Sequence, residues 1–252
     1  MTIPSSPIVT RLRAAGCVFA EDEARLLLSS ARTPAELDAL VARRADGLPL
    51  EQVLGWAEFC GLRITVAPGV FVPRRRTEFL VHEAARLARP GAVIVDLCCG
   101  TGALGAALAA SVERAEVHAV DVDPAAVRCA RRNVPGTVYQ GDLFEPLPST
   151  LRGRVDVLLA NVPYVPTQEI ELLPAEARLH EDRVALDGGP DGLSVLRRVA
   201  AEAPQWLAPG GHLLIETSAA QAPCARTAFT QLAARIAYSD EYDATVVIAT
   251  KA

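Results

Sequence analysis

The sequence lacks three features that would place it in a membrane, outside the cell or around a zinc ion. No apolar run approaches the roughly 20 residues that a membrane-spanning helix needs. The N-terminal stretch shows no basic start followed by a long apolar run, so we expect no secretory signal peptide. None of the six cysteines forms a Cys-x-x-Cys pair, which argues against zinc or another bound metal. Scattered cysteines are typical of a reducing compartment, so we expect a soluble cytoplasmic protein.

A basic excess is missing as well. The formal net charge is −5, which makes the chain a poor candidate for wrapping long nucleic acid through its phosphates. Two short basic segments remain, "PRRR" (73–76) and "RCARR" (128–132), and the second is typical of a solvated helix face. Half of the 252 residues are hydrophobic, which is enough for a large core in one α/β domain with a small appendage.

The first part of the chain has helical patterns. "EDEARLLLSSA" is amphipathic, and "TPAELDALVARRADG" begins with Thr33 as the cap, Pro34 at the first helical position and Glu36 completing a capping box. The following "WAEFCGLRITVAPGVFV" mixes aromatic and β-branched residues around a glycine, which predicts a β-hairpin. The predicted division is a helical domain (residues 1–55), a β-hairpin linker (56–75) and an α/β domain (76–252).

From residue 91 on, strand patterns alternate with helix patterns. "AVIVDLC" is a continuous apolar run, as expected of a strand buried on both faces, and four more strand patterns follow it. The last helix is predicted over residues 221–235, and the tail then gives two strands with no helix between them. This alternation predicts a doubly wound, mostly parallel sheet of seven strands with an antiparallel edge hairpin.

Polar or glycine-rich residues end four consecutive strands, where open α/β sheets bind their ligands. "GTGALG" (100–105) matches the G-x-G-x-x-G pattern, in which glycines let the backbone approach a ligand. Asp121 follows about 20 residues later, where a carboxylate can accept hydrogen bonds from ribose hydroxyls. These features fit NAD and S-adenosylmethionine alike, and a tight turn without a ligand is the structural alternative.

Acidic residues favour the second cofactor. Asp96, just before the glycine loop, suits the ammonium group of S-adenosylmethionine and would repel a pyrophosphate. Asp142 in "GDLF" suits an adenine amino group, with Leu143 beside the ring. A solvated loop is the alternative interpretation of Asp142.

The fourth strand ends in "NVPY" (161–164), which suits a planar amino group. Pro163 holds Val162 extended and stiffens the loop. The Asn161 side chain and a backbone carbonyl together accept both hydrogens of an NH₂ group, while Tyr164 lies flat against its carrier. Accepting these hydrogens concentrates electron density on the nitrogen and aims it at a methyl donor.

Taken together, these motifs resemble the HemK/PrmC-type protein-glutamine N-methyltransferases. The resemblance runs from about residue 48 to 217 and includes "DLCCGTGALG", "AVDVDPAAV", "GDLFEPL", "NVPYVPT" and "HEDRVALDGGPDGLSVLRRV". It implies a class I, Rossmann-like methyltransferase fold that uses S-adenosylmethionine. It also implies that the helical domain (1–55) recognises the substrate and that the α/β domain (76–252) is the S-adenosylmethionine-dependent methyltransferase domain. Its implied substrate is the glutamine of the Gly-Gly-Gln motif in a peptide-chain release factor.

The resemblance and the strand ends together define the candidate site. The candidate cofactor residues are Asp96, Cys98, Cys99, Gly100, Thr101, Gly102, Asp121, Asp142, Leu143 and Asn161. The candidate catalytic residues are Asn161, Pro163 and Tyr164, and Val162 joins them in binding the substrate.

The chain departs from the family pattern close to the substrate. Val162 replaces the family's first proline, Arg75 replaces a linker proline, and Thr217 follows Glu216 where the family tends to place a glycine. The acceptor therefore remains open between a release factor, another protein and an RNA adenine amino group. An NAD(P) oxidoreductase and a non-catalytic docking module are the further alternatives.

Overall fold

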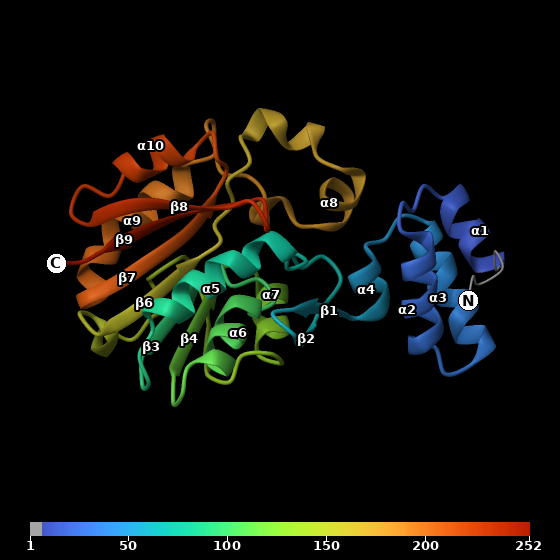
Figure 1. The fold of residues 1–252 in the computed structure, drawn as a ribbon, viewed down its shortest axis with the longest axis horizontal. Helices are drawn as coiled ribbons and strands as arrows, with labels where there is room; N and C mark the ends of the chain where they lie inside the picture. Colours follow the sequence, from blue (N-terminus) through green and yellow to red (C-terminus); the bar gives the residue numbers. More distant parts are fainter. Residues whose placement is uncertain (1–6) are drawn as a thin grey trace.

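A seven-stranded sheet organises the larger part of the molecule (Figure 1). The computed structural model describes residues 7–252. The strand order is β5-β4-β3-β6-β7-β9-β8. The strands are β3 (Val93–Leu97), β4 (Glu116–Asp121), β5 (Thr137–Gln140), β6 (Val155–Ala160), β7 (Leu207–Thr217), β8 (Ala233–Ser239) and β9 (Ala244–Thr250). The predicted fold class is confirmed: β3 to β7 pair in parallel, and β8 and β9 form the antiparallel edge.

The direction in which successive strands are added to the sheet reverses at its centre. β3 pairs with β4 on one side and with β6 on the other, and Leu97 lies opposite both Val120 and Ala160. The chain runs outward from β3 through β4 and β5, and then returns to β6. The loops that follow β3 and β6 therefore open to opposite sides, which leaves a crevice at the carboxyl ends of the two strands.

Helices cover both faces of the sheet. They are α5 (Glu78–Leu87), α6 (Ala103–Ser111), α7 (Pro124–Ala130), α9 (Ser194–Trp206) and α10 (Ala222–Thr227). Ile94 and Leu159 belong to the apolar layer that includes α5 and α6, while Val95 and Leu158 belong to the layer that includes α9. Neighbouring strand residues point to opposite faces, so both must be apolar when both faces are covered.

Among the described residues, the first part of the chain forms four helices and a short hairpin. They are α1 (Pro7–Ala14), α2 (Ala20–Ser30), α3 (Pro34–Ala45), α4 (Leu50–Leu54), β1 (Trp56–Phe59) and β2 (Leu62–Thr65). The first three helices lie at the end of the molecule opposite the C-terminus in Figure 1, and the hairpin lies against the larger part of the molecule. Helix α3 begins as predicted, because the Thr33 side chain accepts the N–H of Glu36 at 3.1 Å. The division into domains itself stays a prediction. No helix among the described residues is long and apolar enough to cross a membrane.

A segment without predicted elements lies between β6 and α9. It contains the helices η3 (Thr167–Leu172), α8 (Ala175–His180) and η4 (Arg183–Ala185). The shorter turns η1 (Arg75–Thr77) and η2 (Ser149–Leu151) lie elsewhere in the chain. Single bridges connect Gly69 with Glu181 and Val165 with Asp187. The segment is therefore held against both the linker and the loop after β6.

The prediction of the last helix is wrong in length. Helix α10 ends at Thr227, and strand β8 begins at Ala233, before the end of the helix predicted over residues 221–235. Ala233 and Ala234 pair with Thr250 and Ala249 of β9. Alanine favours helices by only a few tenths of a kcal/mol to about 1 kcal/mol per residue, and backbone pairing with β9 outweighs that preference.

Arg44 connects the helical region to the segment after β6. Its Nε donates to Glu23 Oε2 at 2.6 Å, and its Nη1 donates to Glu176 Oε1 at 2.7 Å and to the carbonyl of Leu48 at 2.8 Å. The Arg44 side chain is only 9% exposed, so these contacts replace its hydration.

We predict that Arg44→Ala lowers the free energy of unfolding by about 3 kcal/mol, because Glu23 would keep its buried charge without a partner. Arg25→Ala is the control, since Arg25 forms an exposed ion pair with Asp22 that contributes less than about 1 kcal/mol. Urea unfolding of both variants measures the difference. Equal losses would contradict the prediction.

Candidate active site

A cavity of about 720 Å³ lies at the carboxyl ends of β3, β4 and β6. Its size suits a cofactor together with part of a second ligand. Nine of the candidate residues line it: Cys98, Cys99, Gly100, Thr101, Asp121, Asn161, Val162, Pro163 and Tyr164. The crevice at the centre of the sheet therefore brings the loops after β3 and β6 to one site.

Backbone hydrogen bonds shape the loop after β3. The N–H of Gly100 donates to Asp121 Oδ2 at 2.8 Å, and the N–H of Asp123 donates to Asp121 Oδ1 at 2.9 Å. Gly100 has φ +53° and a Cβ there would meet no atom within 4 Å, so this part of the loop is open toward a ligand. Burial raises the pKa of Asp121, and the N–H groups oppose that rise. The free lone pairs of Asp121 suit ribose hydroxyls.

Asp96 and Gly102 do not line the cavity. Asp96 is buried under helix α6 and accepts the N–H of Gly105 at 2.8 Å through Oδ2. Burial raises the pKa of Asp96 to about 7. A Cβ on Gly102 would lie 2.4 Å from Val134 Cγ2, so Gly102 allows helix and loop to pack closely. In the structure both residues pack on the side of the loop after β3 that faces away from the cavity.

Asp142 and Leu143 also lie outside the cavity lining. Asp142 forms an ion pair with Arg198 of α9 at 2.6 Å. Leu143 is buried in the apolar layer beside α9 and has φ +49°, a conformation that the turn after β5 imposes. The predicted roles of these two residues at an adenine ring stay predictions.

The loop after β6 presents free acceptors to the cavity. No described residue forms a hydrogen bond with the Asn161 side chain, and none donates to the carbonyl of Val162. The Val162 side chain is buried in the apolar layer, so its backbone rather than its side chain is available for recognition. Two unused acceptors next to each other are what a planar NH₂ group requires.

Tyr164 completes this half of the cavity and is held at its hydroxyl. Arg76 Nη2 donates to the Tyr164 hydroxyl, which itself donates to Glu216 Oε1 at 3.3 Å. Burial and the carboxylate of Glu216 raise the pKa of Tyr164 above its ordinary value. The phenol therefore stays protonated at neutral pH.

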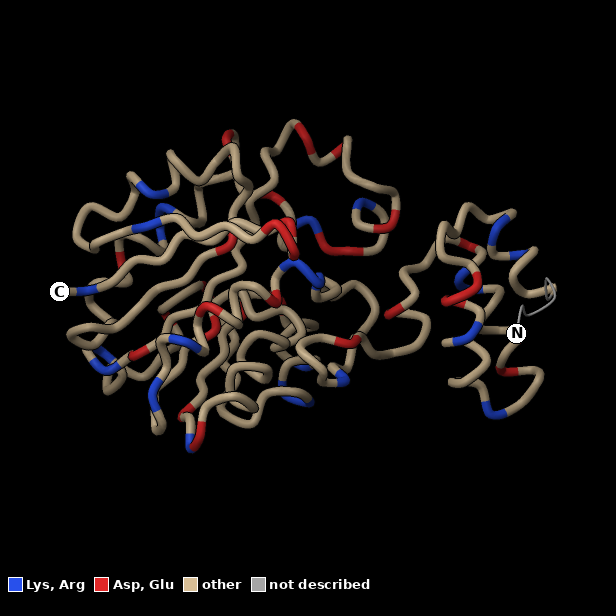
Figure 2. Tube along the Cα trace, in the orientation of Figure 1, with Lys and Arg blue, Asp and Glu red and all other residues tan. Residues whose placement is uncertain are grey.

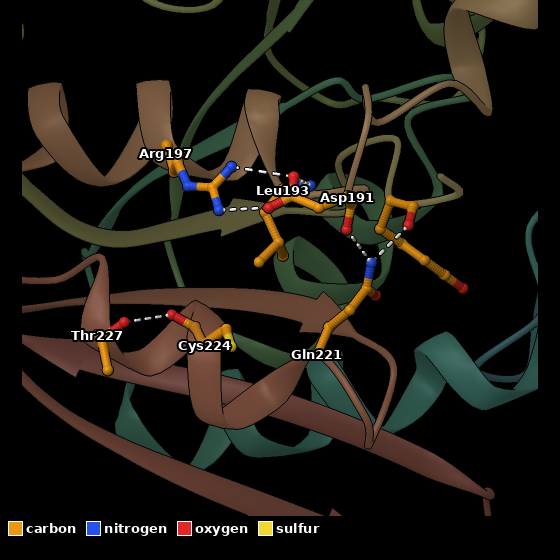
Figure 3. Close-up of polar contacts among 7 residues, drawn as sticks. Asp191, Leu193, Arg197, Gln221, Cys224 and Thr227 are labelled. Carbon is orange, nitrogen blue, oxygen red and sulfur yellow. Dashed lines mark hydrogen bonds and ion pairs between the residues drawn. The ribbon is translucent and has the colours of Figure 1, made fainter. Parts of the chain in front are cut away.

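Two glycines pack against the backbone of the loop after β6. A Cβ on Gly188 would lie 2.7 Å from the Pro163 carbonyl oxygen, and one on Gly192 would lie 2.2 Å from the Tyr164 carbonyl oxygen. Gln221 Nε2 donates to the carbonyls of Tyr164 and Asp191, each at 3.0 Å, and Figure 3 shows this amide pointing at the loop of Asp191. The "LDGGPDG" stretch thus fixes the position of "NVPY".

Charges around the cavity are mainly negative. Six acidic residues and two arginines line it, namely Asp121, Asp123, Glu176, Glu181, Asp182 and Asp243 with Arg74 and Arg76. Figure 2 shows basic residues in the middle of the molecule with acidic segments around them. Both arginines are paired with buried carboxylates, Arg74 with Glu181 at 2.6 Å and Arg76 with Glu216 at 3.3 Å. The site favours a cationic ligand over a dianionic one.

Sequence analysis missed several residues of this site. Arg74 and Arg76 were noted only as members of the basic segment 73–76. Glu216 was noted only as the residue before Thr217, where the family tends to place a glycine. Gln221 and Glu181 drew no attention, because their partners lie far away in the chain. Of these residues, only Glu216 had a local signal for a site residue, because it lies at the carboxyl end of a predicted strand.

Comparisons with known proteins identify the family of this chain. Residues 61–191 match the family model described as Methyltransferase small domain. The release factor glutamine methyltransferase of Geobacter sulfurreducens is 43% identical over 75% of this chain and 68% of that protein. The 4-amino-L-phenylalanine/4-methylamino-L-phenylalanine methyltransferase of Streptomyces pristinaespiralis is 40% identical over 70% of this chain and 63% of that protein. A crystal structure of a methyltransferase from Pyrococcus furiosus, 18% identical, has a TM-score of 0.58 and covers 85% of this chain and 97% of its own.

The sheet order, the loop after β3 and the family model together define a class I methyltransferase. Within that class, sequence identity with curated relatives over most of the chain decides the family. The chain belongs to the release factor glutamine methyltransferase family.

We predict that Gly192→Ala destabilises the protein by at least about 2 kcal/mol more than Gly210→Ala. Both glycines have left-handed φ values, +75° and +73°, so both variants carry the same backbone strain of about 1 kcal/mol. Only Gly192 has no room for a Cβ, because of the Tyr164 carbonyl. Urea unfolding compares the two, and a loss no greater than that of Gly210→Ala would contradict the tight packing.

Proposed function

We propose that this protein uses S-adenosylmethionine to methylate the side-chain amide nitrogen of a glutamine in a protein. The substrate that we infer is the Gly-Gly-Gln motif of a peptide-chain release factor. The observation that carries the proposal is the unused acceptor pair of Asn161 and Val162 beside Tyr164, in the same cavity as the Gly100 loop. Family membership supports the same acceptor.

The residues present fit this cofactor. Asp121 would hold its ribose, and the open backbone at Cys99 and Gly100 would lie along its methionine part. The first turn of α6 already donates the N–H of Gly105 to the buried carboxyl group of Asp96, so this N–H is not available to a pyrophosphate. This arrangement disfavours NAD(P). When bound, S-adenosylmethionine supplies a methyl group carried by a positively charged sulfur.

The loop after β6 contributes to the reaction by orienting the glutamine amide. The Asn161 side-chain oxygen and the Val162 carbonyl accept the two hydrogens of the glutamine NH₂ group, and the Tyr164 ring lies against the amide plane. These hydrogen bonds concentrate electron density on the amide nitrogen and fix its direction. The nitrogen loses one proton to water when it gains the methyl group. No covalent bond to the protein is required.

The same pocket chemistry would also serve an RNA adenine amino group. The cavity carries more acidic than basic residues, and its two arginines are neutralised by Glu181 and Glu216. A polyanionic RNA would therefore gain little electrostatic attraction at this site. A protein acceptor fits these charges better.

The proposed place of action is the cytoplasm. All six cysteines are free, and this supports a reducing compartment. Release factors act in translation, which is consistent with the same location.

We predict that the purified protein transfers label from S-adenosylmethionine to a release factor, and that peptide mapping places it on the Gly-Gly-Gln glutamine. Asn161→Ala is expected to lower kcat by about 100-fold or more, because one of two oriented acceptors is lost. The dissociation constant for S-adenosylmethionine should change less. Thermal unfolding checks that the variant is folded.

A second arm offers 4-amino-L-phenylalanine as the acceptor. Methylation of this amino acid without methylation of any release factor would reassign the substrate. Full turnover by Asn161→Ala would overturn the acceptor pocket.

We predict that Asp121→Ala raises the dissociation constant for S-adenosylmethionine by about 10-fold or more, through lost hydrogen bonds to charged oxygen. The KM for the protein substrate should change far less. Asp38→Ala is the control, since Asp38 is an exposed acid on α3. Calorimetric titration with S-adenosylmethionine and with NAD measures both cofactors, and NAD binding alone would contradict the proposed function.

A further inference from the structure

Tyr164 is attached to the structure at both ends. Its backbone carbonyl accepts Gln221 Nε2 at 3.0 Å, while its hydroxyl lies between Arg76 and Glu216. The Arg76 guanidinium carbon is 5.8 Å from the centre of the tyrosine ring. A ring held at the carbonyl and at the hydroxyl has little freedom to rotate or tilt.

Glu216 is the buried end of this contact. Its side chain is 3% exposed, and Oε2 has no hydrogen-bond partner among the described residues. Its Oε1 receives the Tyr164 hydroxyl and Arg76 Nε, both at 3.3 Å. Burial raises the pKa of Glu216, and the Thr77 hydroxyl and the charge of Arg76 oppose that rise. Arg76 thus helps Glu216 to stay ionised and able to accept from tyrosine.

Arg76 comes from a different part of the chain than the two residues it contacts. It lies in the linker before α5, Tyr164 follows β6, and Glu216 lies near the end of β7. Two residues earlier, Arg74 forms the corresponding pair with Glu181. Alternate arginines of the linker are therefore tied to carboxylates on separate elements around the cavity. Arg75, between them, is exposed, and its side chain forms no hydrogen bond or ion pair with the described residues.

We propose that Arg76 and Glu216 are positioning residues that orient the Tyr164 ring toward the acceptor group. The proposal rests on the proposed function, in which Tyr164 lies against the amide that is methylated. Arg76 and Glu216 act through Tyr164, because their contacts join at its hydroxyl.

Steady-state kinetics with a Gly-Gly-Gln-containing release factor tests the proposal. Arg76→Gln and Glu216→Gln are expected to lower kcat/KM for the acceptor by about 10-fold, the effect of one hydrogen bond to a charged group. The dissociation constant for S-adenosylmethionine should stay within about 2-fold of the wild-type value. Arg75→Gln is the matched control, with the same charge change in the same segment, and should behave like the wild type.

A double-mutant cycle separates positioning from direct substrate contact. In a Tyr164→Phe background the hydroxyl is gone, so adding Arg76→Gln should cause less than about a 2-fold further loss. Additive losses would show that Arg76 contacts the acceptor itself, and would overturn the proposal.

A second readout does not depend on activity. Ring-labelled tyrosine gives NMR signals for all four tyrosines, and the Tyr164→Phe spectrum assigns the signal of Tyr164. Arg76→Gln and Glu216→Gln should both shift that signal, while Arg75→Gln should not. An unchanged Tyr164 signal in both variants would overturn the proposal. Failure of the wild type to methylate any release factor would count against the proposed function, and the NMR result would still decide the positioning role.

Discussion

The parallel pairing of β3 with β6 is the constraint on which the site depends. Leu97 and Ala160 lie side by side at the ends of these strands, so the loops that follow them start within one strand spacing of each other. One loop carries Gly100 and the other carries Asn161. Any slip in this register would move the acceptor pair away from the glycine loop, and the cavity would lose one of its halves.

Around this junction, buried charges receive specific partners. Asp96 is bound by the first turn of α6, Glu181 by Arg74, and Glu216 by Arg76. Each pairing joins elements that meet only in the folded chain. Burying such groups is costly unless they are paired and hydrogen-bonded, so the same contacts that stabilise the fold also fix the walls of the cavity. The linker thereby becomes part of the active site.

Much of this arrangement could be predicted from local patterns. The strand–helix alternation, the glycine loop, Asp121 and "NVPY" are all short-range signals, and the structure brings them together. The prediction of the last helix was wrong because alanines at 233–234 pair with β9, a contact that no local pattern contains. Asp96 was predicted near a ligand from its position at the end of a strand, just before the glycine loop, and Asp142 from its position after a strand; both roles stay predictions. In the structure their carboxylates bind Gly105 and Arg198, contacts that depend on how α6 and α9 dock.

The sequence by itself determined the succession of strands and helices along the chain, the residues at the carboxyl ends of the strands and the acidic balance, because each can be read from neighbouring residues or from composition. Only the tertiary structure decided which carboxylate each linker arginine meets and what holds Tyr164. Those partners are separated by 52 to 140 positions, as in Tyr164 with Glu216 or Arg76 with Glu216. Hydrogen bonds over such separations follow from sheet register and helix packing, and a local sequence pattern does not encode them.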